Sequence, residues 1–280
     1  MLMSTKANRY AHALIKARAG GTLHPRITDE DKISLDDAYD IARSLINIRI
    51  ANGETPVGRK ILFSNRKLQA RYGHSTPVDT PLWTTLFDGD VEFALDNAAT
   101  HSLTKAQQPR IAPQLVFKLA RTPAPDATVG DLADSLEWMA HGFAVAVSPY
   151  RQWEFDAADA VAAFGLHRKL LVGEPRMLSR QGRKYLDEVL GMASLSLSRT
   201  TAEGSGLCAA GFGSDLMGSP LRALHWLQQT LQQQPDFAPL QAGEIIATGS
   251  WTNPLPVKRG EVWSSAFAQL NLPGLNLVFS

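Results

Sequence analysis

After Pro56 the chain consists largely of short apolar runs separated by glycine, proline and asparagine, and this pattern constrains the fold more than any other feature. The runs read VGRKILFSN, VEFAL, QLVFKLA, FAVAVS, EIIATGS, VWSSAF and LNLVFS. Such runs, bounded by turn residues, are typical of buried strands, and LGMASLSLS alternates as a half-exposed strand does. Many strands with scattered helices predict an α+β domain built on a rolled or barrel-like mixed sheet.

Helical periodicity dominates the first 55 residues. The first helix is amphipathic, with one face formed by Ala7, Tyr10, Ala11, Leu14 and Ala17. A second helix begins at Ser34, where Asp37 completes an acidic variant of a capping box, and ends near Asn52-Gly53. We therefore expect a helical N-terminal part, residues 1–55, and a β-rich catalytic-type domain, residues 56–280.

Three further helices interrupt the predicted strands. They are expected at about 129–140, at 156–164 before Gly165, and in SPLRALHWLQQTLQQQ, which begins at Ser219. In the last of these, leucines recur on one stripe, so this helix should pack against the sheet.

Composition excludes several classes of function. The 280 residues are 44% hydrophobic and 20% charged, and the formal net charge is +1 with no basic stripe, which argues against a nucleic-acid partner. The single cysteine, Cys208, allows neither an internal disulfide nor a cysteine-based metal site. No run approaches the roughly 18 apolar residues of a membrane span, and the N-terminus lacks the apolar core of a signal peptide. A cytoplasmic protein is the expectation.

Six blocks of the sequence occur in the order of a known family. They read VGRKILFSN, VDTPLWTTLFD, PRIAPQLVFKL, HGFAVAVSPYRQWEFDAADAVAAFGLHRKLLVG, GSPLRALHWL and GEIIATGSWTNPLPVKRGEVW. Together they resemble the fumarylacetoacetate hydrolase superfamily, in its branch of 2-keto-4-pentenoate hydratases and 4-oxalocrotonate decarboxylases. The resemblance implies a rolled mixed sheet with outer helices, a homo-oligomer, and chemistry on small 2-keto acids with Mg²⁺ or Mn²⁺ held by three carboxylates.

The three positions of those carboxylates carry other residues in this chain. Where the family pattern reads Glu-Pro-Glu, the chain has Ala112-Pro113-Gln114, and the third family glutamate falls on Ala144. Positions 112 and 114 share one face of a strand. Alanine offers no ligand and glutamine offers one neutral oxygen, which is a poor set for a hard divalent cation. We therefore expect that the metal cofactor has been lost.

The resemblance also indicates which residues remain in the site. It places Lys60 at the active site, and Asp79 matches an acidic position that could pair with Lys60, relay a proton, or simply cap a turn. The expected substrate-binding residues are Arg59, Ser64, Asn65, Gln114, Ser148, Tyr150 and Thr252. The seven histidines, His141 and His167 included, show no metal-ligand spacing, so we expect structural roles for them.

Three functions compete. The first is a metal-independent lyase-type enzyme acting on an enolisable keto compound by hydratase, dehydratase, tautomerase or cyclase chemistry. In it a protonated Lys60 would stabilise an enolate, or a neutral Lys60 would form a Schiff base. The second is a non-catalytic partner or scaffold subunit of a related hydratase or decarboxylase. The third is a metal enzyme that uses unexpected ligands.

Overall fold

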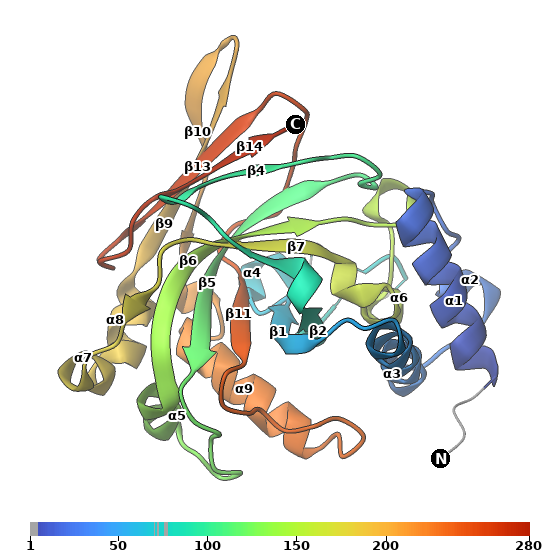
Figure 1. Ribbon diagram of the computed structural model, residues 1–280, viewed down its shortest axis with the longest axis horizontal. Helices are drawn as coiled ribbons and strands as arrows, with labels where there is room; N and C mark the ends of the chain where they lie inside the picture. Colours follow the sequence, from blue (N-terminus) through green and yellow to red (C-terminus); the bar gives the residue numbers. More distant parts are fainter. Residues whose placement is uncertain (1–4, 70, 72, 76–77) are drawn as a thin grey trace.

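The computed structural model describes residues 5–69, 71, 73–75 and 78–280, and its centre is a strongly curved mixed sheet (Figure 1). The strands of this sheet are β1 (Pro56–Leu62), β2 (Leu82–Phe87), β3 (Val91–Phe93), β5 (Arg110–Leu119), β6 (Leu136–Ala146), β7 (His167–Val172), β8 (Arg176–Met177), β11 (Ile245–Ser250) and β12 (Leu255–Pro256). Their order is β2-β1-β11-β5-β6-β7-β3, with β12 beside β5 and β8 beside β6. The predicted α+β class with a rolled mixed sheet is confirmed.

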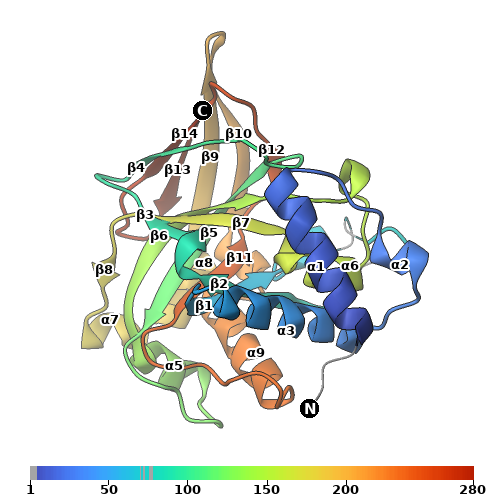
Figure 2. The ribbon, with the colours of Figure 1, turned by 45° about the vertical axis from the view of Figure 1, so that its right-hand side comes forward.

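A second, smaller sheet closes one end of the molecule (Figure 2). Its strands are β4 (Ala98–His101), β9 (Ser194–Thr201), β10 (Gly204–Phe212), β13 (Val262–Ala268) and β14 (Leu275–Phe279), in the order β10-β9-β13-β14-β4. The predicted alternating strand in LGMASLSLS begins only at Ser194, because the preceding residues end a helix.

Helices surround the curved sheet. They are α1 (Thr5–Gly20), α2 (Ile27–Glu30), α3 (Leu35–Ala51), α4 (Arg66–Gln69), α5 (Val129–Ser135), α6 (Ala157–Ala162), α7 (Arg180–Lys184), α8 (Leu186–Met192) and α9 (Pro220–Gln232), with 3₁₀ turns η1 (Asp88–Asp90), η2 (Arg151–Trp153), η3 (Phe164–Leu166) and η4 (Gly213–Asp215). Among the described residues, no helix is long and apolar enough to cross a membrane.

The N-terminal helices form as their sequence predicts. The buried face of α1 consists of the five predicted residues, Ala7, Tyr10, Ala11, Leu14 and Ala17. Ser34 caps α3 by accepting a hydrogen bond from the Asp37 amide at 3.1 Å, and the Asp37 carboxylate accepts one from the Ser34 amide at 2.8 Å. Helix α3 packs against both α1 and α6, so the predicted division at residue 55 stays a prediction.

One predicted helix is wrong in its second half. The helix expected at 129–140 ends at Ser135, and Leu136 begins β6. The reason is tertiary pairing, because β6 lies between β5 and β7 and both of its edges are hydrogen-bonded. Gly142 supports this packing, since a Cβ there would lie 2.7 Å from Val116.

The two faces of the curved sheet carry different cores. Paired residues in a sheet share a face, and Val116 pairs with Ala140 on one side and Ala247 on the other. These three belong to a small buried cluster that also contains Leu86, Trp138, Leu170, Val172 and Ile245. We call the face that carries Val116 the inner face. Lys60 pairs with Ala247, and Gln114 lies two residues from Val116, so both start from this inner face.

Candidate active site

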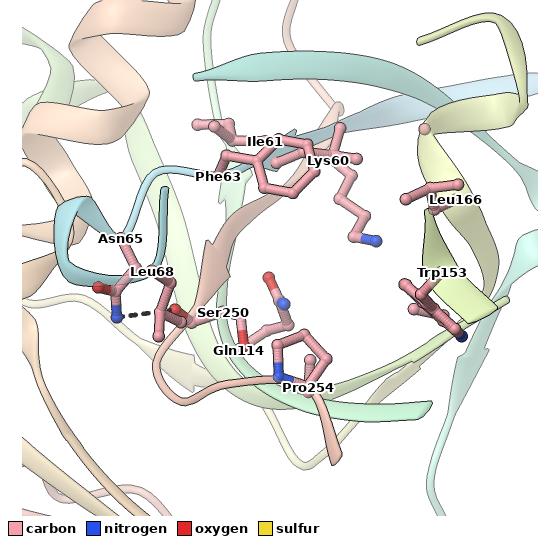
Figure 3. A pocket seen from close by; sticks show the side chains of 14 residues that line it. Lys60, Ile61, Phe63, Asn65, Leu68, Gln114, Trp153, Leu166, Ser250 and Pro254 are labelled. Atoms are coloured by element: carbon pink, nitrogen blue, oxygen red, sulfur yellow. Dashed lines mark hydrogen bonds between the residues drawn. The ribbon is translucent and has the colours of Figure 1, made fainter. Parts of the chain in front are cut away.

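A cavity of about 60 Å³ lies on the inner face beside the small cluster (Figure 3). Its apolar wall includes Phe63, Leu68, Trp153, Leu166 and Pro254, and its polar side chains are those of Lys60, Asn65, Gln114 and Ser250. Such a space is large enough for ordered water or for the reacting end of a small ligand. Of the described residues that line the cavity, Lys60 alone carries a charge.

Lys60 lies in the cavity without a counter-ion among the residues that the structure describes. The residue is 5% exposed, and its Nζ points into the space that Gln114 also faces (Figure 3). Within the described part of the chain, Nζ forms no ion pair or hydrogen bond. Burial lowers the pKa of Lys60 to about 8, and the charge of Asp90 opposes this shift only in part. An ammonium in such surroundings is costly, which favours either the neutral amine or a bound anion.

The Asp90 carboxylate is already engaged by two arginines. Arg49 Nη1 donates to Asp90 Oδ2 at 2.7 Å, and Arg18 Nη2 donates to Oδ1 at 3.1 Å. Arg49 also pairs with Glu54. The two guanidinium groups come from α3 and α1, so this cluster fastens the N-terminal helices to η1. It leaves Asp90 little capacity to neutralise Lys60 as well.

The three positions of the family's glutamates come together beside Lys60. Ala112 pairs with Ala144 across β5 and β6, and Gln114 follows on the same face. Gln114 Oε1 accepts a hydrogen bond from the Gly249 amide at 2.9 Å, while its Nε2 has no partner among the described residues. The one oxygen of this set is therefore already used.

These residues do not fit a divalent metal. Two alanines, one engaged amide and a neighbouring lysine offer no hard anionic oxygen. Across the described ranges, no group of three or more His, Cys, Asp or Glu side chains is placed to hold an ion. The loss of Mg²⁺ or Mn²⁺ stays a prediction that metal analysis must test.

The polar residues after β1 hold the loop that follows β11. Asn65 Nδ2 donates to the carbonyls of Ser250, at 3.4 Å, and Trp251, at 3.3 Å. Ser64 Oγ donates to the Thr248 carbonyl at 2.8 Å and lies outside the cavity lining. Gly249 has φ +108°, and a Cβ there would lie 1.8 Å from Ser64 Oγ. Asn65 thus reaches the cavity as predicted, whereas Ser64 is placed to position the loop.

Arg59 does not share the cavity with Lys60. Neighbouring residues of a strand point to opposite faces, so Arg59 lies on the outer face of β1. There its Nη2 approaches Glu244 at 3.6 Å, and its guanidinium lies 5.5 Å from the Trp83 ring centroid. Arg59 and Lys60 are adjacent in the block GRK, so the resemblance places both in one site although strand alternation points them to opposite faces.

Three other predicted binding residues are used by the protein itself. Ser148 Oγ donates to the Tyr150 carbonyl at 3.2 Å, and Tyr150 Oη donates to the Asp159 carbonyl at 3.1 Å. Thr252 Oγ1 donates to the Asn253 carbonyl at 3.3 Å, and its neighbours Ser250 and Pro254 line the cavity in its place. Each hydroxyl thus donates a hydrogen bond to a backbone carbonyl, which is a common role of serine and threonine in turns.

Asp79 lies apart from Lys60. It is exposed and does not line the cavity. Among the described residues it forms no ion pair with Lys60. The buried carboxylate whose charge acts on Lys60 is that of Asp90. Asp90 lies in η1, just after β2, whereas Asp79 precedes β2.

The apolar wall was missed by sequence reasoning. Phe63, Trp153 and Leu166 line the cavity, and each has positive φ, at 54°, 62° and 52°. Non-glycine residues in this region carry backbone strain of order 1 kcal/mol or more, and such residues gather at functional sites. No spacing in the sequence signals this, although Trp153 lies in the block that carries the resemblance.

One histidine also departs from expectation. His141 bonds to Ser265 Oγ at 2.5 Å through Nε2, as a structural histidine should. His167 is 2% exposed, yet in the described structure both of its ring nitrogens are buried without a hydrogen-bond partner. Burial, followed by the charges of Lys60, Arg18 and Arg49, holds its pKa well below the usual value. A neutral imidazole therefore lies near Lys60.

Comparison with known proteins gives relatives that span nearly the whole chain, although no family model matches it. A 2-hydroxyhexa-2,4-dienoate hydratase of Comamonas testosteroni is 28% identical over 262 residues, covering 92% of this chain and 91% of that protein. A 4-oxalocrotonate decarboxylase of a Pseudomonas species is 25% identical over 255 residues, covering 91% of each.

Solved structures agree on the fold. The 4-oxalocrotonate decarboxylase of Pseudomonas putida G7, complexed with magnesium and adipate, superposes with a TM-score of 0.84 at 22% identity and covers 100% of this chain and 99% of that one. The predicted resemblance is confirmed: homologues of the chain are 2-keto-4-pentenoate hydratases and 4-oxalocrotonate decarboxylase, and its fold is that of the fumarylacetoacetate hydrolase superfamily.

Proposed function

We propose that this homologue of hydratases and decarboxylases is a lyase of the hydratase type that acts on a small enolisable keto compound without a divalent metal. The observation that carries the proposal is Lys60, a buried cation without a counter-ion among the described residues, which faces the same cavity as Ala112 and Gln114. Ala112 and Gln114 occupy two of the positions where the resemblance implies metal-binding glutamates, which supports a role for the Lys60 charge in place of the metal. Hydration, dehydration, tautomerisation and cyclisation of an enolisable keto compound can each proceed through an enol or enolate, so each is open to such a site.

The chemistry asked of Lys60 is charge stabilisation. As a proton leaves the carbon beside a carbonyl, negative charge develops on the carbonyl oxygen. A cation in an apolar cavity is worth more than the same cation in water, because solvent does not screen it. The unpartnered Nε2 of Gln114 supplies a second donor in the same space, where it can orient a carboxylate or hydroxyl oxygen of the substrate.

Deuterium exchange tests this proposal without knowledge of the natural substrate. In D₂O, the protein should accelerate exchange of the hydrogens beside the carbonyl of 2-oxopentanoate, followed by proton NMR. The acceleration should persist in excess chelator and vanish in Lys60→Met. Lys118→Met is the matched control, because Lys118 lies in the same sheet but is paired with Glu137 at 3.0 Å. Exchange that depends on added Mg²⁺ or Mn²⁺ would contradict the proposal.

A scaffold subunit is the second candidate, and the edge of the smaller sheet favours it. Strand β10 projects from the body of the molecule (Figure 2) and exposes Leu207 by 68% and Phe212 by 50%. An apolar edge strand of this kind is suited to association, including the predicted homo-oligomer. Sedimentation of wild type and Leu207→Glu tests the association. A stable assembly that shows no exchange activity would favour the scaffold.

A further inference from the structure

We propose that Lys60 acts covalently, by forming an imine between its Nζ and the carbonyl carbon of a 2-oxo acid that carries one carboxylate and an apolar tail. This inference rests on the proposed function and specifies how the positive charge reaches the substrate. The charge is placed on the carbon skeleton itself, as an iminium, instead of beside the carbonyl oxygen.

Among the described residues, no acceptor forms a hydrogen bond with the Lys60 Nζ, and the polar side chains of the cavity are engaged elsewhere. Gln114 Oε1 accepts from the Gly249 amide, and Asn65 Oδ1 accepts from the Lys67 amide at 3.1 Å. Ser250 Oγ donates to the Thr252 carbonyl at 2.5 Å. An ammonium needs three acceptors, whereas an amine buried in an apolar cavity needs far less. The surroundings thus make the neutral amine, which is the nucleophile, more accessible than it is for a lysine in water.

The nearby charges favour the same form. The Asp90 carboxylate is shared by Arg18 and Arg49, and Glu54 pairs with Arg49, so both anions of this cluster are already engaged by its two arginines. The charge of Lys60 also helps to lower the pKa of His167, so this imidazole is neutral. In the described structure neither of its ring nitrogens has a hydrogen-bond partner. It is therefore available for proton exchange, although the imine itself requires only Lys60.

The step balances without a further reactant. The Nζ lone pair forms a bond to the carbonyl carbon, the C=O π bond breaks, and one nitrogen proton moves to the oxygen to give a carbinolamine. A second proton, which the Lys60 ammonium releases to solvent before attack and which solvent returns to this oxygen, lets the oxygen leave as water and gives the iminium. The sum is ammonium plus carbonyl giving iminium plus water. Loss of the neighbouring C–H proton then yields an enamine, which is the nitrogen counterpart of the family's enol.

The lining selects the class of substrate. An iminium that carries its own carboxylate is neutral overall, so it can be buried where the protein provides no counter-ion. The unpartnered Nε2 of Gln114 can donate to this carboxylate. The remaining wall, formed by Phe63, Leu68 and Trp153 among others, is apolar, so a second carboxylate on the tail would be buried without a partner. We therefore expect 2-oxopentanoate to be favoured over its dicarboxylate counterpart, 2-oxoglutarate.

Reductive trapping tests the imine. Borohydride reduces an iminium to a stable secondary amine, so full-length protein treated with borohydride and 2-oxopentanoate should gain the mass of one probe molecule less one oxygen atom. Peptide mapping should locate the adduct on residue 60, and 2-oxoglutarate should label several-fold less. Lys60→Met and Lys60→Arg should lose the adduct completely, while Lys118→Met should label as wild type does. A thermal melt of each variant shows whether it is folded.

The arginine variant separates this inference from the proposed function. Lys60→Arg keeps a positive charge but cannot form an imine. If wild type exchanges the hydrogens of 2-oxopentanoate without a trapped adduct, and folded Lys60→Arg still exchanges them, the imine is overturned and the metal-independent enzyme stands. If folded wild type gives neither exchange nor adduct with either probe, both proposals fall.

Discussion

The buried cations Arg18 and Arg49 differ from the nearby Lys60 in whether carboxylates neutralise their charge. Arg18 and Arg49 share the carboxylate of Asp90, and Arg49 also binds Glu54. Lys60, on the inner face of β1, has no such partner in the described structure. A paired buried charge contributes to fixing the fold, whereas an unpaired one costs stability and persists where a ligand will use it. The contrast separates a structural charge cluster from a candidate active site.

The buried charge of Lys60 lowers the free energy of unfolding. Its pKa falls from 10.5 to about 8, which corresponds to about 3 kcal/mol lost from stability at neutral pH. Removing Asp90 would instead leave Arg18 without its carboxylate partner and Arg49 with Glu54 alone, at a cost of about 3 kcal/mol. The two charges therefore affect stability with opposite sign.

Lys60→Met should have the largest effect on function and little adverse effect on stability. Loss of a preorganised charge that stabilises an oxyanion slows turnover by about 10²- to 10³-fold, and loss of an obligatory imine by more. Methionine keeps the apolar stem, so folding should be spared. Exchange kinetics and urea unfolding of the same preparation check both statements. A variant that loses activity only because it unfolds would place Lys60 with the structural charges.

Asp90→Asn should have the opposite profile. The substitution preserves shape but removes the anion that Arg18 and Arg49 share, so the free energy of unfolding should fall by about 3 kcal/mol. Residual activity per folded molecule should remain near that of wild type. Urea titration with activity normalised to the folded fraction is the measurement. Full stability in Asp90→Asn would show that the cluster does not fasten α1 and α3 as described.

The free energy of unfolding should rise with pH because of Lys60. The unfolded lysine holds its proton up to about pH 10.5, whereas the folded one releases it near pH 8, so the unfolded state binds more protons between these values. Stability due to Lys60 therefore rises with pH through this window and is lowest below it. Urea unfolding at pH 7 and pH 9 should show a rise in wild type that is missing in Lys60→Met. Equal changes in both proteins would mean that another group titrates.

The sequence alone predicts much of this architecture because strand and helix signals are local. Ser34 with Asp37, the buried face of α1 and the glycine-bounded strands were readable without tertiary information. The end of α5 was not, because the pairing of β6 with its two neighbours decides it. In the site, Lys60 and Gln114 line the cavity as the resemblance of their sequence blocks implies. Arg59 does not, because strand alternation overrides adjacency in sequence.

Restoring the family's glutamates should convert the cavity toward a metal site. Ala112→Glu, Gln114→Glu and Ala144→Glu together supply three carboxylates on adjoining positions of β5 and β6. We expect Mn²⁺ binding in the triple variant and none in the single ones, because chelation needs several oxygens at once. Lys60 would compete by pairing with the new carboxylates, so adding Lys60→Met should tighten binding. Isothermal titration with Mn²⁺ measures this, and no binding at millimolar metal would show that the cavity has been reshaped.

Asp79→Asn should have the smallest effect. Asp79 is exposed and outside the cavity lining, so its charge is screened by solvent and its loss should change stability by less than about 0.5 kcal/mol. Activity should also stay within about twofold of wild type. If Asp79→Asn instead weakens exchange strongly, and the double variant with Lys60→Met is no worse than Lys60→Met alone, the two residues act as a unit. That result would mean that Asp79 acts together with Lys60 when substrate binds, and the unpaired state of Lys60 would then belong to the free protein alone.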